Sequence, residues 1–596
     1  MVFGYQPIHD YDERHTHHRI LRKIIPIVII VICVGILLVL TFWTTPDNLS
    51  PSPFLIIAKN GAVATEVDKC SNIGVDILKD GGSAVDAAIA AELCVGTINA
   101  FSAGIGGGGL LLIRLPNGTA EVIDFRETAP LNATKKMFVG TPKNASIGVR
   151  SVAVPGEIRG MWEAHQRYGK LPWESLFKPS IKLSREGFAV SAELALRLEL
   201  YKNDIENTAK TNLSKIYAPS GKVLKENDIL YRHNFSKTLE IISKNYSEFY
   251  DGRIAKALVE EIQSKNGTIQ EIDFKNYSVK IRRPIIGNYR GRKIITTPEP
   301  TSGPSLIFML NLLENYEMPK NRLDVKNFHR IAEVMKFGFA RRTELCDPEF
   351  VPKSKETVKQ HEDRIKEIMS KEYAASIRAN ISDDHTFPVE YYKPKYDQPE
   401  DHGTTHISVI DKNGMAVSFT STVNLIWGSQ VLNLETGILL NDEMDDFSIP
   451  GRSNSFGLEP SPYNYIEPGK RPVSSTVPTI VENKDGKLEL VAGGSGGSRI
   501  LTAVLQVLLN VFDFDMNLEE AIDSLRIHHQ LVPNSIGVER GFEYKLVDEL
   551  IDKKHVVQIY DQQDRTYSCQ VQAVRQFKKT IHAASDKRKH GKAAGY

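Results

Sequence analysis

The chain has 596 residues, which is enough to bury a large core and to hold more than one domain. Its 74 basic and 73 acidic residues give a formal net charge of +1, so no basic field favours a nucleic-acid partner. The shares of apolar, charged and aromatic residues are typical of a globular protein.

An apolar segment near the N-terminus predicts a membrane anchor. Residues 24–43 carry no charge, consist largely of Ile, Val and Leu, and are long enough to cross a bilayer as one helix. Several basic residues precede this segment, whereas the first one after it is Lys59, which places residues 1–23 in the cytosol. A cleaved signal peptide has a shorter apolar region and a small-residue cleavage site. We therefore expect a type II signal anchor in the plasma membrane, followed by a proline-containing stalk at residues 44–53.

Two features agree with an extracytoplasmic location for the rest of the chain. Asn-x-Ser/Thr sequons occur at Asn48, Asn117, Asn132, Asn144, Asn212, Asn234, Asn245, Asn266, Asn276 and Asn380. All of them precede Thr404, and together they predict a glycosylated ectodomain. The cysteines beyond the anchor are Cys70, Cys94, Cys346 and Cys569. An oxidising compartment permits disulfides, and four cysteines allow three full pairings.

Helical patterns and glycine-rich turns dominate the chain up to residue 403. Ser83 is the predicted N-cap of an alanine-rich helix. The glycines of residues 104–109 lack the features of a phosphate loop or a dinucleotide fingerprint, so they predict close backbone packing before a buried strand at 110–113. Residues 155–377 are mainly helical in pattern. Residues 383–403 contain three prolines, several acids and tyrosines, and predict an exposed loop.

The pair Gly403–Thr404 stands directly before a predicted β-hairpin. Residues 405–410 and 416–423 are rich in β-branched side chains, and an Asp-Lys-Asn-Gly turn joins them. A threonine that begins a buried strand becomes a nucleophile if the chain is cut before it. Its hydroxyl attacks, and the new α-amine, with a pKa near about 8, accepts the proton. Spacing alone does not decide between Thr404 and Thr405.

The C-terminal third predicts further strands and helices around a glycine-rich loop. A strand is expected at 487–492, and helices are expected at 500–511 and near 518–525. Residues 495–498 lie at the strand-to-helix junction, where free backbone N–H groups offer a site for an anion. Strands flanked by helices on both sides indicate a layered α/β architecture.

Several longer motifs resemble those of the γ-glutamyltransferases, N-terminal-nucleophile enzymes that cut themselves into a large and a small subunit. In chain order these motifs are Asp124-Phe-Arg-Glu127, Gly437-Ile-Leu-Leu-Asn-Asp-Glu-Met-Asp-Asp-Phe447, Pro472-Val-Ser-Ser-Thr-Val-Pro478, Gly493-Gly-Ser-Gly-Gly497 and the terminal Ala-Gly-Tyr596. The resemblance covers roughly residues 54–596. It implies a four-layer αββα sandwich in which residues 54–403 and 404–596 form one heterodimeric unit after cleavage. It also implies that Thr404 is the nucleophile, and its mammalian members have a disulfide that matches Cys70–Cys94 in spacing.

The resemblance further implies a γ-glutamyl substrate such as glutathione, whose γ-glutamyl end carries an ammonium and a carboxylate on one carbon. It assigns Glu443 and Asp446 to the ammonium, while Asp442 and Asp445 are directed elsewhere. Arg126 would bind the carboxylate, because a guanidinium fork suits two oxygens.

The remaining roles follow the same resemblance. Thr422 orients the hydroxyl of Thr404, and the N–H groups of Gly496 and Gly497 bind the oxyanion. Additional hydrogen bonds to the substrate are expected from Asn424, Ser474 and Ser475. The γ-glutamyl group then passes to water, an amino acid or a dipeptide, without a metal or a cofactor. Cleavage between Gly403 and Thr404 would use the same hydroxyl.

Two residues depart from the family pattern. His402 replaces a small residue before the glycine, which bears on the rate of maturation. Ile426 stands where mammalian members carry a tyrosine, which bears on acceptor preference and on the ratio of transfer to hydrolysis. Lys589 matches a family lysine and receives no role. The alternatives are a catalytically silent membrane-anchored relative with a binding or scaffold role, and an N-terminal-nucleophile amidase with another substrate.

Overall fold

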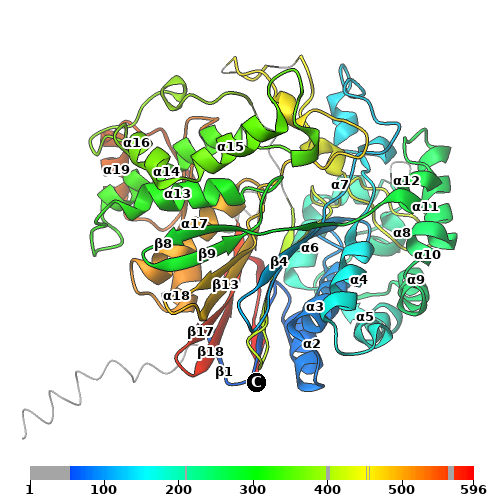
Figure 1. Ribbon diagram of the computed structural model, residues 1–596. Helices are drawn as coiled ribbons and strands as arrows, with labels where there is room; N and C mark the ends of the chain where they lie inside the picture. The colour runs from blue at the N-terminus through cyan, green and yellow to red at the C-terminus, as the bar shows by residue number, and fades with distance from the viewer. Residues whose placement is uncertain (1–53, 208–210, 398–402, 452, 456, 562–568) are drawn as a thin grey trace, which may run out of the picture. The chain divides into compact units, whose positions relative to one another are not determined.

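Two seven-stranded sheets lie at the centre of the computed structural model (Figure 1). The structure describes residues 54–596 except 208–210, 398–402, 452, 456 and 562–568. The first sheet has the order β1 (Ile56–Ala58), β18 (Thr580–Ser585), β17 (Gln570–Phe577), β13 (Leu488–Ser495), β12 (Thr479–Glu482), β9 (Arg292–Thr296) and β8 (Ile285–Tyr289). The second has the order β19 (Ala594–Gly595), β2 (Ala62–Ala64), β10 (Thr405–Ile410), β11 (Ala416–Thr422), β3 (Gly108–Arg114), β4 (Ala120–Phe125) and β7 (Lys280–Arg282).

Both sheets mix strands from before and after Gly403. In the second sheet, β10 and β11 form the predicted hairpin, and they lie between β2 and β3. In the first sheet, β12 pairs with β9 on one side and with β13 on the other. All of these pairings are antiparallel. Neither half of the chain therefore completes either seven-stranded sheet alone, and the expected single unit built from both halves is present.

Helices cover the outer face of each sheet. The second sheet packs against α2 (Asp68–Lys79), α3 (Ala84–Ile98) and α4 (Glu157–Tyr168). The first packs against α13 (Gly303–Glu314), α17 (Arg499–Phe512) and α18 (Leu518–Asp523). In Figure 1 the two groups of helices lie on opposite sides of the paired sheets. This is the helix–sheet–sheet–helix order of the predicted αββα sandwich.

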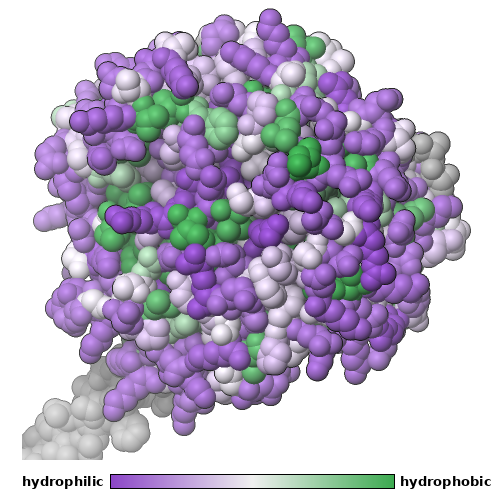
Figure 2. All heavy atoms as spheres, turned by 45° about the vertical axis from the view of Figure 1, so that its right-hand side comes forward, coloured by the Kyte–Doolittle hydropathy of each residue, from purple (hydrophilic) through white to green (hydrophobic). Residues whose placement is uncertain are grey.

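The face of the protein in Figure 2 is largely hydrophilic, as expected when the apolar faces of the helices are directed into the layers. Hydrophobic side chains gather on this face only in small, separate patches. Within the described residues, no helix has both the length and the apolar character that a membrane crossing requires. The predicted cytosolic tail, anchor and stalk, residues 1–53, lie outside the described residues.

A buried polar network joins the two sheets behind the start of β10. The ring of His406 contacts the Thr420 hydroxyl at 2.8 Å, and Ser418 donates to the Ala492 carbonyl at 3.0 Å. A Cβ at Gly493 would lie 2.2 Å from the His406 ring, so this position needs glycine. Burial lowers the pKa of His406 to about 3, which keeps the ring neutral. The network holds the first residues of β10 against the opposite sheet.

Local features of the large N-terminal part match their predictions. Ser83 caps α3 through a reciprocal pair of bonds, because Asp86 N–H donates to the serine hydroxyl and Ser83 N–H donates to the Asp86 carboxylate. The Cys70–Cys94 disulfide is present and joins α2 to α3. Cys346 and Cys569 are free thiols, and both are buried.

The prediction of an exposed loop at residues 383–403 is wrong for part of the segment. Val389 and Tyr392 are buried, and the Tyr392 hydroxyl donates to Glu333 at 2.7 Å. The polar composition suggested exposure, but a partner on the distant helix α14 (Val325–Arg342) buries these side chains. Residues 398–402, which include His402, lie outside the described residues.

Candidate active site

The backbone turns sharply at Gly403 and Thr404, where φ is 102° and 91°. L-residues rarely adopt such values, and a threonine that does so is strained. A Cβ at residue 403 would lie 1.7 Å from the Asn424 carbonyl oxygen, so only glycine fits. Thr404 is buried immediately before β10. The sequence thus has glycine where both φ and space require it.

A backbone donor faces the carbonyl of Gly403. The N–H of Gly496 donates to this oxygen at 3.1 Å. Gly496 and Gly497 lie between β13 and α17, with φ of 128° and 61°. One of the two N–H groups predicted to bind an oxyanion is therefore already bonded to the carbonyl that precedes Thr404.

The Thr404 hydroxyl donates to the Thr422 hydroxyl at 3.3 Å, so the predicted contact is present. The Thr422 oxygen also accepts the N–H of Asn424 at 2.8 Å. Thr422 ends β11, the strand that pairs with β10, and this pairing brings the two hydroxyls together. The Asn424 side chain donates to the Asp442 carbonyl at 3.2 Å.

A buried ion pair contacts the Thr404 backbone through Lys589, which the sequence analysis left without a role. The Lys589 ammonium donates to the Thr404 carbonyl at 3.3 Å and pairs with Glu66. Both charged side chains are buried. Burial lowers the pKa of Lys589, and the Glu66 carboxylate opposes that shift. The sequence offered only the isolated Lys589 as a signal for this contact. Its acidic partner Glu66 lies 523 residues away, so no local pattern connects the two.

The predicted substrate-binding charges lie together in one buried group. Arg126 pairs with Glu443 and Asp446 through its two terminal nitrogens, and its Nε donates to the Pro472 carbonyl at 2.9 Å. One cation and two anions give this group a net charge of −1. A bound zwitterion would add one charge of each sign. The net charge of the group would stay the same, while its side chains would form ion pairs with the zwitterion.

The other two acids of this turn are directed elsewhere, as predicted. The Asp442 carboxylate accepts Leu425 N–H at 2.9 Å, and the Asp445 carboxylate accepts the Ser146 hydroxyl at 2.7 Å. Asp445 also lines a hollow of 680 Å³. The acidic turn therefore has two residues on Arg126 and two on neighbouring backbone and side-chain donors.

Ser474 and Ser475 follow Val473, whose carbonyl accepts a bond from Arg126 at 3.2 Å. The Ser475 hydroxyl accepts a bond from Arg342 at 2.8 Å, and the Ser474 hydroxyl contacts Thr476 at 3.0 Å. Both serines are thus held next to the arginine that the sequence analysis assigned to the substrate. In this arrangement their hydroxyls bond to protein groups.

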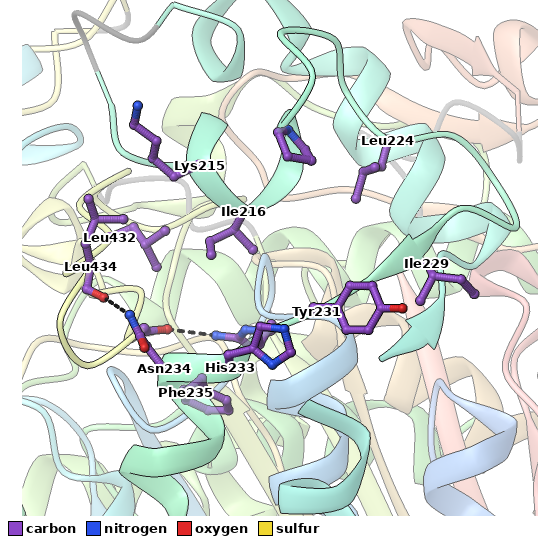
Figure 3. A pocket seen from close by; sticks show the side chains of 13 residues that line it. Lys215, Ile216, Leu224, Ile229, Tyr231, His233, Asn234, Phe235, Leu432 and Leu434 are labelled. Carbon is purple, nitrogen blue, oxygen red and sulfur yellow. Dashed lines mark hydrogen bonds between the residues drawn. The ribbon is translucent and has the colours of Figure 1, made fainter. Parts of the chain in front are cut away.

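A second cavity, of 440 Å³, has no part in this arrangement (Figure 3). Its walls come from α8 (Ser214–Tyr217), β6 (Ile229–Leu230), the start of α9 (His233–Lys244) and residues 432–437. Apolar side chains predominate, and Asn234 donates to the Leu434 carbonyl at 2.8 Å. The described residues that line it include none of the predicted site residues.

A buried carboxyl next to Arg126 gives a pH-dependent prediction. Burial raises the pKa of Glu127 from 4.5 to about 8, although Arg126 opposes the shift. The folded protein therefore keeps a proton that the unfolded chain loses above 4.5, so the free energy of unfolding falls as pH rises between 4.5 and about 8. Glu127→Gln stays neutral and should remove this loss, which is on the order of a few kcal/mol.

Melting temperatures across this pH window test the prediction. The advantage of Glu127→Gln over the unmodified protein should grow as the pH rises. Glu174→Gln, which changes an exposed glutamate on α5 (Trp173–Glu186), is the matched control and should show no such growth. A constant difference between the Glu127→Gln and unmodified proteins would contradict the buried neutral carboxyl.

An αββα sandwich with a buried threonine at the head of a central strand is the architecture of the N-terminal-nucleophile hydrolases. The chain belongs to the γ-glutamyltranspeptidase family, whose model matches residues 70–596. Glutathione hydrolase proenzyme 1 of Schizosaccharomyces pombe is 45% identical over 556 residues, which is 92% of this chain and 86% of that protein.

Solved structures agree with this assignment. The Helicobacter pylori γ-glutamyltranspeptidase structure is 32% identical, with a TM-score of 0.50, and the match covers 55% of this chain and 93% of that one. Cephalosporin acylase from Bacillus halodurans shares the fold, with a TM-score of 0.79 at 23% identity, over 93% of this chain and 99% of that one.

Proposed function

We propose that the chain is a cell-surface γ-glutamyltransferase that cleaves the γ-glutamyl bond of glutathione and related compounds through a γ-glutamyl ester on Thr404. Water, an amino acid or a peptide then takes the γ-glutamyl group. The observation that carries this proposal is the Gly403 carbonyl, which accepts Gly496 N–H at 3.1 Å next to a buried threonine. Membership in the γ-glutamyltranspeptidase family supports the substrate class.

Maturation is the first reaction of the proposed sequence. The Thr404 hydroxyl attacks the Gly403 carbonyl carbon, and Gly496 N–H binds the developing oxyanion. The C–N bond breaks, the Thr404 nitrogen takes a proton, and an ester to the Thr404 oxygen remains. Water hydrolyses the ester and leaves a free α-amine on Thr404. The positive φ values on both sides of the bond favour this route, because cleavage releases the strain.

Turnover repeats the same chemistry on a substrate. The γ-carbonyl takes the position that the Gly403 carbonyl has before cleavage, so Gly496 N–H, joined by that of Gly497, binds the new oxyanion. Loss of one such donor costs about 3 kcal/mol in other enzymes. The free α-amine of Thr404 accepts the hydroxyl proton. The Lys589 contact with the Thr404 carbonyl supports a fixed position for the nucleophile.

Recognition of the γ-glutamyl end follows from the buried charges. Arg126 binds the α-carboxylate, and Glu443 and Asp446 bind the α-ammonium. Arg126 already pairs with both acids, so the charges of the protein are buried before the substrate binds, and binding exchanges their ion pairs for new ones to the substrate. Ile426 packs against an apolar cluster and brings no hydroxyl to the acceptor side.

A γ-glutamyl-anilide assay tests the proposed activity. The purified protein should release the anilide, and added glycylglycine should raise the rate because an amine resolves the ester faster than water. A catalytically silent relative, the second candidate, would release no anilide under either condition. Circular dichroism should show that an inactive preparation is folded, so that the lack of activity is attributed to the active site and not to unfolding.

The proposed topology predicts N-glycans on the large fragment alone. Nine of the ten sequon asparagines lie among the described residues, and each is at least partly exposed. Residues 24–43 would anchor this fragment in the membrane. Glycosidase treatment of the protein from a eukaryotic host should therefore speed the migration of the large fragment and leave the small fragment unchanged. A shift of the small fragment would contradict the proposed sites.

A further inference from the structure

Three side chains that commonly bind metals converge outside the active site. Glu299 follows β9, Cys346 follows α14, and His361 lies on α15 (Val358–Ile368). All three are buried, and each offers a ligand atom within 4.8 Å of the other two. The reaction proposed above uses none of them.

The spacing of these atoms fits a tetrahedral ion. The Cys346 sulfur lies 3.3 Å from the His361 Nε2, which is 3.1 Å from each Glu299 oxygen. A tetrahedral zinc ion has bonds of about 2.3 Å to sulfur and about 2.0–2.1 Å to nitrogen and oxygen, which separate its ligand atoms by about 3.4–3.6 Å. An outward movement of a few tenths of an ångström would admit the ion.

A second layer of bonds already orients the ligands. The His361 Nδ1 bonds to Glu356 at 2.9 Å, and the Tyr463 hydroxyl donates to the same Glu356 oxygen at 3.0 Å. Cys346 N–H donates to Glu299 at 2.8 Å. A histidine that binds zinc through one nitrogen commonly gives its other N–H to a carboxylate. Here that carboxylate directs Nε2 toward the thiol and Glu299.

Another group of candidate ligands lacks this arrangement. His329, Glu333 and His555 also lie within reach of one another. However, the Glu333 carboxylate of this group already pairs with the buried Lys336 ammonium at 3.5 Å. Glu333 accepts the Tyr392 hydroxyl at 2.7 Å. An ion at Glu333 would have to displace a buried ammonium, whereas the contacts that an ion would replace in the Cys346 group are those between its own three ligands.

We propose that Glu299, Cys346 and His361 bind one divalent cation of the zinc class, with water as the fourth ligand. The thiolate and imidazole favour zinc over the hard cations magnesium and calcium. On binding, the thiol proton and any proton between His361 and Glu299 leave to solvent, and the metal–ligand bonds replace them. The Glu356 side chain is 21% exposed, so the site lies one side chain below the surface.

The ion would stabilise the segment that contains Ser474 and Ser475, two of the predicted substrate-binding residues. Glu299 precedes Pro300, whose carbonyl accepts Ser474 N–H at 2.9 Å. Cys346 precedes Asp347, whose carboxylate accepts Arg471 N–H at 3.0 Å. Both bonds hold the segment that contains Ser474 and Ser475. A bound ion would therefore cross-link the two loops that support this segment and raise the stability of the fold.

Cobalt is a spectroscopic probe for this site. The full-length protein, purified in detergent and freed of metal with a chelator, is titrated with Co²⁺. One equivalent should produce a thiolate-to-cobalt charge-transfer absorption, which Zn²⁺ should abolish. Cys346→Ser should lose this absorption. Cys569→Ser, which removes the second free thiol found in the described part of the chain, is the matched control and should keep it.

A second variant, which keeps all three ligands, tests the site even if Cys346→Ser fails to fold. Glu356→Gln keeps all three ligands and should weaken Co²⁺ binding about 10- to 100-fold. Circular dichroism of each apo-protein confirms the fold before titration. The proposal is overturned if the unmodified protein gives no charge-transfer absorption, if Cys346→Ser retains it, or if Glu356→Gln binds Co²⁺ as tightly as the unmodified protein.

Discussion

Thr404→Ala should leave the chain uncut and lower kcat/KM by at least about 10⁴-fold, because one hydroxyl performs both maturation and turnover. The alanine keeps the backbone but removes the atom that attacks the Gly403 carbonyl. Gel mobility reports the cleavage, and the γ-glutamyl-anilide assay reports turnover. Thr404→Ser should retain part of both activities, since it restores a nucleophilic oxygen.

The neighbouring threonine supplies the control. The Thr405 hydroxyl is buried and has no hydrogen-bond partner among the described residues. Thr405→Val keeps its shape, so it should cleave and turn over like the unmodified protein. A Thr404→Ala chain that matures normally but does not turn over would separate the two reactions and contradict a shared nucleophile.

Asp446→Ala should lower kcat/KM for glutathione about 10- to 100-fold while leaving maturation much less affected. Asp446 is proposed to bind the substrate ammonium, which takes no part in self-cleavage. A charge-assisted hydrogen bond contributes about 1.5–3 kcal/mol, and a buried ammonium left without a partner costs more. At about 1.4 kcal/mol per factor of ten, the loss falls in this range.

Asp445→Ala is the matched change one residue away. The Asp445 carboxylate bonds to Ser146, whereas Asp446 pairs with Arg126. Removing the Asp445 carboxylate should therefore lower kcat/KM much less than removing that of Asp446. Both variants must be compared as cleaved protein, so that a maturation defect does not lower the apparent rate. Equal losses would mean that the ammonium site has been assigned to the wrong acids.

Contiguous motifs made much of the site predictable from sequence. Thr404 and Thr422 meet because the hairpin pattern sets the pairing of β10 with β11, and this pattern is local. The family resemblance directed alternate acids of residues 442–446 to different sides, and the short helical turn Glu443–Asp446 carries that arrangement. Such features depend on neighbours within about twenty residues.

Contacts between distant segments could not be predicted in the same way. The pairing of Lys589 with Glu66 depends on how the last strand, β19, returns to β2 at the other end of the chain. The buried Tyr392 depends on Glu333, which lies on a helix far earlier in the sequence. Composition describes a segment by itself, whereas burial depends on the partner that the fold supplies.

N-terminal sequencing of the small fragment tests the central claim most directly. The proposed mechanism requires attack by the Thr404 hydroxyl on the carbonyl that accepts Gly496 N–H, so the bond between Gly403 and Thr404 must break. The sequence of the small fragment should begin Thr-Thr-His. A fragment that begins at Thr405, or an active preparation that consists of the uncut chain, would contradict the account.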